Sequence, residues 1–178
     1  MAVIKFQFNP EKTAEAVIYL AQKFPQPTFL ALAKLLYFAD KTSLENYGRS
    51  VTGDAYYAMQ HGPVPSGAYD MMKAARDTDI YGFHVEYERT IVPDRPANLN
   101  RLSKSDIQCL DQILTAYGNY PVWQLRELSH DEAWQKAWAT AGDAHSIRIP
   151  IEDIVATVDE ENGDLLEFLR ETHKPERD

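Results

Sequence analysis

One stretch of the sequence, residues 28–48, limits the possible folds more than any other. Apolar residues recur there at the i, i+3, i+4, i+7 spacing of one helix face, at Leu32, Leu35, Leu36 and Ala39. Large apolar side chains widen this stripe until little surface is left for water, namely Phe29, Leu30, Tyr37 and Phe38. Thr28 can cap the start, and Gly48 can adopt the left-handed backbone that ends a helix. We therefore predict a helix buried at the centre of the fold.

Helical spacing also marks segments on both sides of this central helix. Further helices are expected to begin near Asn9, Ser66, Ser103, Pro121 and Asp131. Pro10 suits a first helical position, and Asp106 can complete a capping box, taking the place usually held by Glu. Leucines at 165, 166 and 169 indicate a final amphipathic helix before a frayed end at residues 174–178.

Three segments have no helical period. Residues 51–59 are prone to β-structure and predict one or two short strands, and residues 83–87 alternate in polarity with a possible partner at 90–92. Two prolines and a glycine in residues 61–65 predict a rigid connector without regular structure. The expected fold is a mainly α, α+β domain over residues 1–178, with a small antiparallel sheet or hairpin beside the buried helix.

The composition excludes several classes of protein. The chain has 178 residues, 44% of them hydrophobic, and no apolar run approaches the roughly 20 residues of a membrane-spanning helix. A net charge of −9 argues against an autonomous nucleic-acid binder. A single cysteine, Cys109, fits a reducing compartment, and the first residues show no secretory signal. We expect a water-soluble, cytoplasmic protein.

The negative charge is concentrated in the C-terminal part. Residues 150–178 hold 10 acidic and 3 basic side chains, whereas the body of the chain is nearly neutral. An acidic helix or tail of this kind is either a solubilising surface or a docking face for a basic partner. Both interpretations stay open.

Catalytic motifs are scarce. The sequence has no nucleophile elbow, phosphate-binding loop, zinc-protease helix or paired cysteine motif. The one enzyme-like fragment is His130-Asp131, because this doublet supplies two metal ligands in helical metal-dependent phosphohydrolases. We favour the simpler interpretation, that Ser129, His130 or Asp131 caps a helix. The other histidines lack ligand spacing, so we expect no metal and no cofactor.

Asp40 stands out because it closes an apolar helix. A carboxylate in such a place must be paired or exposed. The nearby candidates for its partners are Lys41, Arg49 and the backbone amides of the turn at Thr52 and Gly53. Such pairing would be structural.

Four sequence blocks resemble a known family. They are Lys34–Asp40 (KLLYFAD), Tyr47–Arg49, Thr52–Asp54, and residues 61–69, which begin HGPVP. Their order and spacing are similar to those of the Panacea domain, the SocA-like family of antitoxins. The resemblance continues more loosely through residues 128–134 and 149–150, so it covers about 13–154.

The resemblance implies a protein that acts by contact, not by catalysis. Such an antitoxin neutralises a cognate toxin by direct binding, the toxin is usually encoded by the adjacent gene, and no cofactor, nucleic acid or membrane is involved. Members are paired with unrelated toxin classes, so the domain does not identify the toxin. One branch resembles adaptors that deliver a partner to an AAA+ protease, and other members are phage-associated interaction modules.

Polar and amphipathic side chains in and around the four blocks are the candidates for contact with the toxin. Tyrosine and arginine are enriched in interface hot spots. The alternative, that these blocks are shared because they build the fold, stays open. The candidates are Tyr37, Asp40, Tyr47, Arg49, Asp54, Tyr56, His61 and Tyr69.

Overall fold

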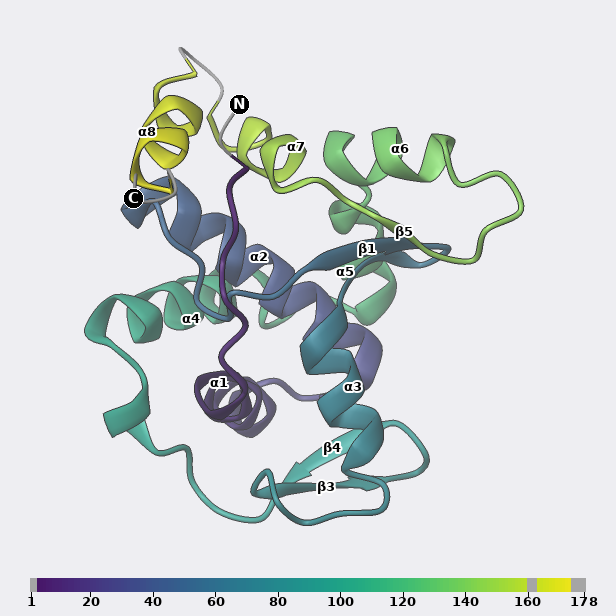
Figure 1. Ribbon diagram of the computed structural model, residues 1–178. Coiled ribbons are helices and arrows are strands. Elements are labelled where there is room, and N and C mark those ends of the chain that lie inside the picture. Colours follow the sequence, from purple (N-terminus) through teal and green to yellow (C-terminus); the bar gives the residue numbers. More distant parts are fainter. Residues whose placement is uncertain (1–2, 160–162, 174–178) are drawn as a thin grey trace.

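The computed structural model describes residues 3–159 and 163–173 (Figure 1). The helices are α1 (Pro10–Lys23), α2 (Phe29–Tyr47), α3 (Ser66–Ala74), α4 (Lys104–Tyr117), α5 (Val122–Ser129), α6 (Glu132–Ala139), α7 (Ile151–Ala156) and α8 (Asp164–Thr172). The strands are β1 (Tyr56–Met59), β2 (Gly62–Pro65), β3 (Phe83–Glu86), β4 (Thr90–Pro93) and β5 (Ile147–Arg148). The fold is mainly α, of the α+β class, as the sequence predicts.

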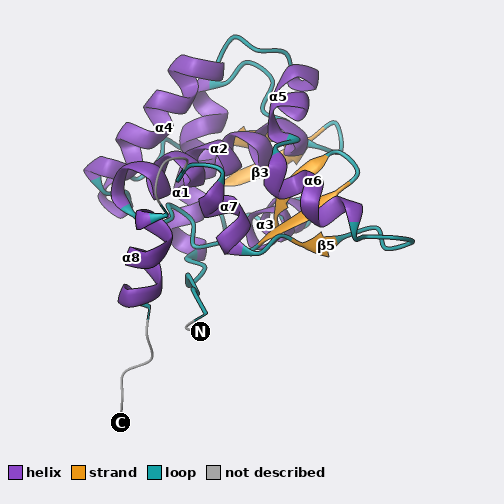
Figure 2. Ribbon diagram, turned by 90° about the horizontal axis from the view of Figure 1, so that it is seen from above, coloured by secondary structure: helices purple, strands orange, loops and turns teal. Residues whose placement is uncertain are grey.

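Helix α2 forms the centre of the molecule, as predicted. Thr28 caps it by accepting a hydrogen bond from the Ala31 amide, and Gly48 ends it at φ 64°. The residues from Ala31 to Ala39 are no more than 7% exposed. Helices α1, α3, α4, α5 and α7 and strand β2 all contact α2. Figure 2 shows the strands on the opposite side of α2 from α4 and α8.

Strands β2, β1 and β5 form an antiparallel sheet in that order. The prediction that residues 61–65 lack regular structure is therefore wrong. Strand β2 is an edge strand, in which Pro63 pairs with Ala58 and Pro65 with Tyr56. Proline is tolerated on an edge because its missing N–H can face away from the neighbouring strand.

Strands β3 and β4 form a separate hairpin that is attached to the start of α2. The Phe29 amide donates to the carbonyl of Arg89, and the Ile91 amide donates to the carbonyl of Pro27, both at 2.9 Å. In the hairpin turn, Tyr87 and Glu88 adopt φ values of 49° and 69°. Residues other than glycine rarely adopt this left-handed backbone conformation, so the turn stores strain.

Replacing Glu88 by glycine should raise the free energy of unfolding by about 0.5–1 kcal/mol, because glycine adopts positive φ without strain. Thermal unfolding of the variant would measure the effect. Glu86→Gly in strand β3 is the matched control and should lower stability, since its backbone is extended. Equal destabilisation by both changes would contradict a strained turn.

The acidic C-terminal part contains α7 and α8. Phe168 and Leu165 of α8 lie next to Gly48 at the end of α2, and the His173 ring meets the Phe6 ring edge-on at 5.0 Å. The predicted amphipathic helix is confirmed, with Leu169 fully buried. The expected frayed end at 174–178 lies outside the described residues.

Candidate protein-binding site

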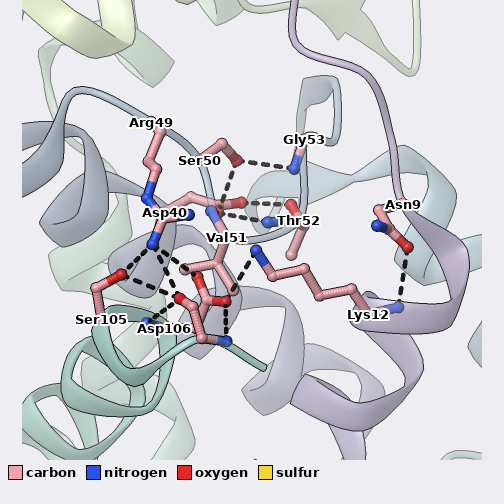
Figure 3. Close-up of polar contacts among 11 residues, drawn as sticks. Asn9, Lys12, Asp40, Arg49, Ser50, Val51, Thr52, Gly53, Ser105 and Asp106 are labelled. Atoms are coloured by element: carbon pink, nitrogen blue, oxygen red, sulfur yellow. Dashed lines mark hydrogen bonds and ion pairs between the residues drawn. The ribbon is translucent and has the colours of Figure 1, made fainter. Parts of the chain in front are cut away.

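Asp40, in the C-terminal half of α2, is the centre of a buried polar network (Figure 3). It is 2% exposed. Its Oδ1 accepts hydrogen bonds from the Val51 amide (2.7 Å), the Thr52 amide (3.0 Å) and the Ser50 hydroxyl (2.8 Å). Its Oδ2 accepts from the hydroxyls of Thr52 and Tyr56, each at 2.6 Å. The carboxylate thus fixes the loop between α2 and β1.

The sequence-based candidates for the partners of Asp40 are only partly right. The amides of the following turn do bind it, but at Val51 and Thr52 rather than Gly53. In the part of the chain that the structure describes, Asp40 forms no ion pair with Lys41 or Arg49. Hydrogen bonds alone therefore stabilise this buried charge.

Tyr37 and Tyr56 are buried beside this network. The Tyr56 hydroxyl donates to Asp40, and the Tyr37 hydroxyl donates to Asp131 at 2.7 Å. Burial, reinforced by the neighbouring carboxylates, raises the pKa of both tyrosines well above the usual value, so both stay neutral. Tyr37, Asp40 and Tyr56 are 0–3% exposed, so their side chains lie inside the folded chain and not on its accessible surface. Their assignment as contact residues stays a prediction, and the structure shows an internal role for all three.

Asp54 holds the start of α3 in place. Its Oδ1 accepts hydrogen bonds from the amides of Ala55 and Gly67, and its Oδ2 accepts from the Ala68 amide. Burial raises the pKa of Asp54 in spite of these bonds. A carboxylate is well placed at the positive end of a helix. The structure therefore gives the half-buried Asp54 an internal role, with its carboxylate engaged by backbone.

Tyr47 and Arg49 form a partly exposed polar patch where α2 ends against α4. The Arg49 guanidinium donates to the Ser103 hydroxyl at 2.9 Å and to Ser105, and lies 3.8 Å from the carboxylate of Asp106. The Tyr47 hydroxyl donates to Gln108. Both side chains remain accessible, since the Arg49 side chain is 43% exposed and Tyr47 is 42% exposed.

Asp106 connects this patch to α1. It completes the predicted capping box with Ser103, and its Oδ2 also binds the Lys12 ammonium at 2.9 Å (Figure 3). A fully buried carboxylate is thus shared by a helix cap and two basic side chains.

The His130-Asp131 doublet is part of the packing between α2 and α6. Asp131 caps α6 by accepting from the Trp134 amide, and its other oxygen binds both Tyr37 and the Lys41 ammonium, at 2.7 and 2.8 Å. The His130 ring stacks on the Trp134 ring at 3.8 Å. Across residues 3–159 and 163–173, the structure brings together no group of three side chains suited to a metal ion.

Lys34 is a buried basic side chain that is not among the sequence-based candidates for the site. It is 0% exposed, and its ammonium donates to the carbonyl of Pro63 at 2.8 Å. Burial, with a smaller contribution from Arg126, lowers the pKa of Lys34 to about 7. Gly62 lies against it at φ 106°, where a Cβ would stand 2.9 Å from the Lys34 nitrogen and 2.6 Å from the Ser129 hydroxyl. The signal was present, because Lys34 interrupts the apolar run of α2.

A cavity of about 700 Å³ opens between the start of α2, the β1–β2 hairpin, α3 and the loop that joins α6 to β5. That loop extends at the right of Figure 1. The wall carries the aromatic side chains of Phe29, Tyr69 and Trp138, and two arginines, Arg76 and Arg89, belong to the lining. We refer to this cavity as the aromatic groove.

The aromatic groove contains two of the sequence-based candidates, His61 and Tyr69. His61 is exposed and accepts a hydrogen bond from Arg126 at 3.1 Å, and Tyr69 packs edge-on against Phe29. The exposed or half-buried candidates are thus divided between two places, with Tyr47 and Arg49 at the other end of α2.

The model of the family described as "Antitoxin SocA-like, Panacea domain" matches residues 32–135, more than half of the chain. The chain belongs to this family. The matched part runs from α2 to α6, somewhat less than the 13–154 that the resemblance suggested. No curated protein and no solved structure matches the chain.

All four sequence blocks lie within the part of the chain that matches the Panacea domain. They supply part of α2, the Asp40 network, the Asp54 cap of α3 and strand β2, so many of their residues support the loop and hairpin that follow α2.

None of the helices that the described residues form is long and apolar enough to cross a bilayer.

Proposed function

We propose that this protein is an antitoxin that neutralises a cognate toxin by direct binding, without catalysis. The family match over residues 32–135 is the observation that carries the proposal. The partner is then a toxin protein, encoded by the adjacent gene, and both act in the cytoplasm. We further propose that residues 1–178 act together as one domain.

The buried carboxylates support this function because they bind groups of the protein itself. Asp40 and Asp54 are engaged with the protein's own backbone, and Asp131 serves as a helix cap. These carboxylates therefore hold loops and helix ends in fixed positions. A fixed surface is what inhibition by contact requires, because binding loses less conformational entropy when the surface is already ordered.

The accessible candidates are the residues that we propose for toxin contact. They are Tyr47 and Arg49 at the end of α2, and His61 and Tyr69 in the aromatic groove. Direct inhibition, delivery to an AAA+ protease and a phage-associated interaction role all need such a surface. We favour direct inhibition because it requires no further component.

Co-expression with the neighbouring open reading frame tests the proposal. We expect the neighbour alone to arrest growth of a bacterial host, and the pair to grow normally. The two proteins should also co-purify, since direct inhibition requires a stable complex.

The amount of toxin in the rescued cells separates the two modes of neutralisation. Direct binding leaves the toxin at its full level, in hosts with or without the AAA+ protease. Rescue that depends on the protease would favour the adaptor alternative. A neighbour that is harmless alone would contradict the antitoxin proposal and favour the phage-associated module.

A further inference from the structure

We propose that the aromatic groove receives a segment of the toxin in which an apolar side chain stands next to a carboxylate. This inference rests on the proposed function and names the surface and the chemistry of the contact. Part of the groove lies outside the sequence blocks that carried the resemblance, because Arg76, Arg89 and Trp138 come from later segments.

The apolar wall of the aromatic groove is held in a fixed arrangement. The Phe29 and Tyr69 rings meet edge-on at 6.0 Å, and Phe29 is 4% exposed. Trp138 stacks on Trp134 at 6.0 Å, and the Trp134 indole donates to the carbonyl of Met59 at 2.9 Å. Rigid aromatic side chains of this kind bury an apolar anchor at low entropic cost.

The two arginines give the groove a basic side. The Arg76 guanidinium lies 4.9 Å above the Phe29 ring and donates two hydrogen bonds to the carbonyl of Glu88, at 3.0 and 2.8 Å. Arg89 is exposed, and within the described residues its side chain forms neither a hydrogen bond nor an ion pair. Asp143 is the acidic residue of the lining.

This basic side contrasts with the protein as a whole, which carries a net charge of −9. Two arginines beside an apolar wall complement a carboxylate that flanks an apolar side chain, because guanidinium groups bind carboxylates through two parallel hydrogen bonds. A groove of about 700 Å³ has room for a few side chains, not for a folded domain. It therefore suits a segment of the partner.

The strained hairpin turn belongs to the same region. Tyr87 and Glu88 have positive φ and lead directly into Arg89, whose carbonyl is bound by the Phe29 amide. Tyr87 is 87% exposed. Backbone strain often accompanies binding surfaces, where it holds side chains in a position that function requires. The turn presents an exposed tyrosine next to the unpaired arginine.

Two substitutions test the groove without removing packed side chains. Arg89→Glu reverses the charge of the exposed arginine, and Ala144→Trp fills the groove from its exposed loop. Lys5→Glu, in the segment before α1, is the matched control, since it makes the same change of charge at an exposed site outside the groove and away from Tyr47 and Arg49. Thermal unfolding should be the same for all three and the wild type.

The probe is the purified product of the neighbouring open reading frame, with short overlapping peptides that cover its sequence. Both groove variants should bind it at least about tenfold more weakly than the wild type, whereas the Lys5→Glu variant should bind normally. A bound peptide should contain an apolar residue beside Asp or Glu, and should lose affinity when that acid is replaced by its amide.

Unchanged toxin binding by both groove variants would overturn this inference and leave the proposed function standing. A neighbour that the wild type neither binds nor neutralises would overturn both. A further outcome is that a free nucleotide raises the unfolding temperature of the wild type but not that of either groove variant. That result would overturn the toxin-segment inference in favour of a small anionic ligand.

Discussion

Alanine in place of Asp40 should lower the free energy of unfolding by about 3 kcal/mol or more. The change leaves the Val51 amide and the Tyr56 hydroxyl buried without an acceptor, and it frees the loop that precedes β1. Each unsatisfied buried donor costs roughly 1–3 kcal/mol. The expected loss is a large part of the roughly 5–15 kcal/mol that stabilises an ordinary domain.

Two further substitutions, which remove fewer hydrogen bonds than alanine does, test whether the loss of stability comes from the hydrogen bonds of Asp40. Asp40→Asn keeps the shape but turns one acceptor into a donor facing other donors, so its effect should be smaller than that of alanine but still exceed about 1 kcal/mol. Tyr56→Phe removes one bond together with its donor and should have the smallest effect of the three. Chemical denaturation monitored by circular dichroism gives all three values.

Asp77→Ala is the control, because Asp77 is exposed and none of the side-chain bonds in the described chain involves it. Its effect should stay within about 0.5 kcal/mol. If Asp40→Ala were no more destabilising than this control, the network would not support the loop. The residues would then have to be reconsidered as a binding site.

The helices of this protein are predictable because their signals are local. Asn9, Thr28 and Ser103 each cap a helix through an amide three residues further on, so the sequence alone contains both members of each contact. The end of α2 at Gly48 is equally local. Such features depend little on the rest of the fold.

Strand β2 and the aromatic groove depend instead on contacts between distant segments. Whether the prolines of residues 61–65 break a strand depends on which edge faces its neighbour, and the sequence does not show this. The contact between Tyr37 and Asp131 joins residues 94 positions apart. The groove combines segments from Phe29 to His145, so no single motif indicates it.

The candidate site residues show the same limit. Tyr37 and Tyr47 both belong to α2, yet one is buried and the other is 42% exposed. On a helix that is apolar on nearly every face, periodicity cannot separate core tyrosines from surface tyrosines. What covers each position is decided by α4, α5 and α6, which come much later in the chain.

Between pH 7 and pH 9, the wild-type protein should gain stability on the order of 2 kcal/mol from Lys34. Burial lowers the pKa of Lys34 to about 7 in the folded state, whereas a free lysine titrates near 10.5. In this range the unfolded chain binds more protons at this site than the folded chain. Stability therefore rises with pH, by at most about 1.4 kcal/mol per pH unit.

Lys34→Met should abolish this rise, and the difference between the two stability curves isolates Lys34 from other titrating groups. His84, whose pKa is raised by its bonds to Asp94 and Glu86, acts in the opposite direction and is present in both proteins. Cys109, whose pKa is raised by burial, also acts in the opposite direction as the pH approaches 9, and it is likewise present in both proteins. Denaturant unfolding at several pH values, with Lys104→Met as the exposed control, provides the curves.

Parallel curves for the wild type and Lys34→Met would contradict a neutral Lys34 in the folded protein. The ammonium would then keep its charge at alkaline pH. Among the described residues the Lys34 nitrogen forms one hydrogen bond, to the carbonyl of Pro63, so that charge would need water at the β1–β2 hairpin. The size of the pH-dependent difference between the two curves therefore reports how far burial against Gly62 and Pro63 lowers the pKa of Lys34.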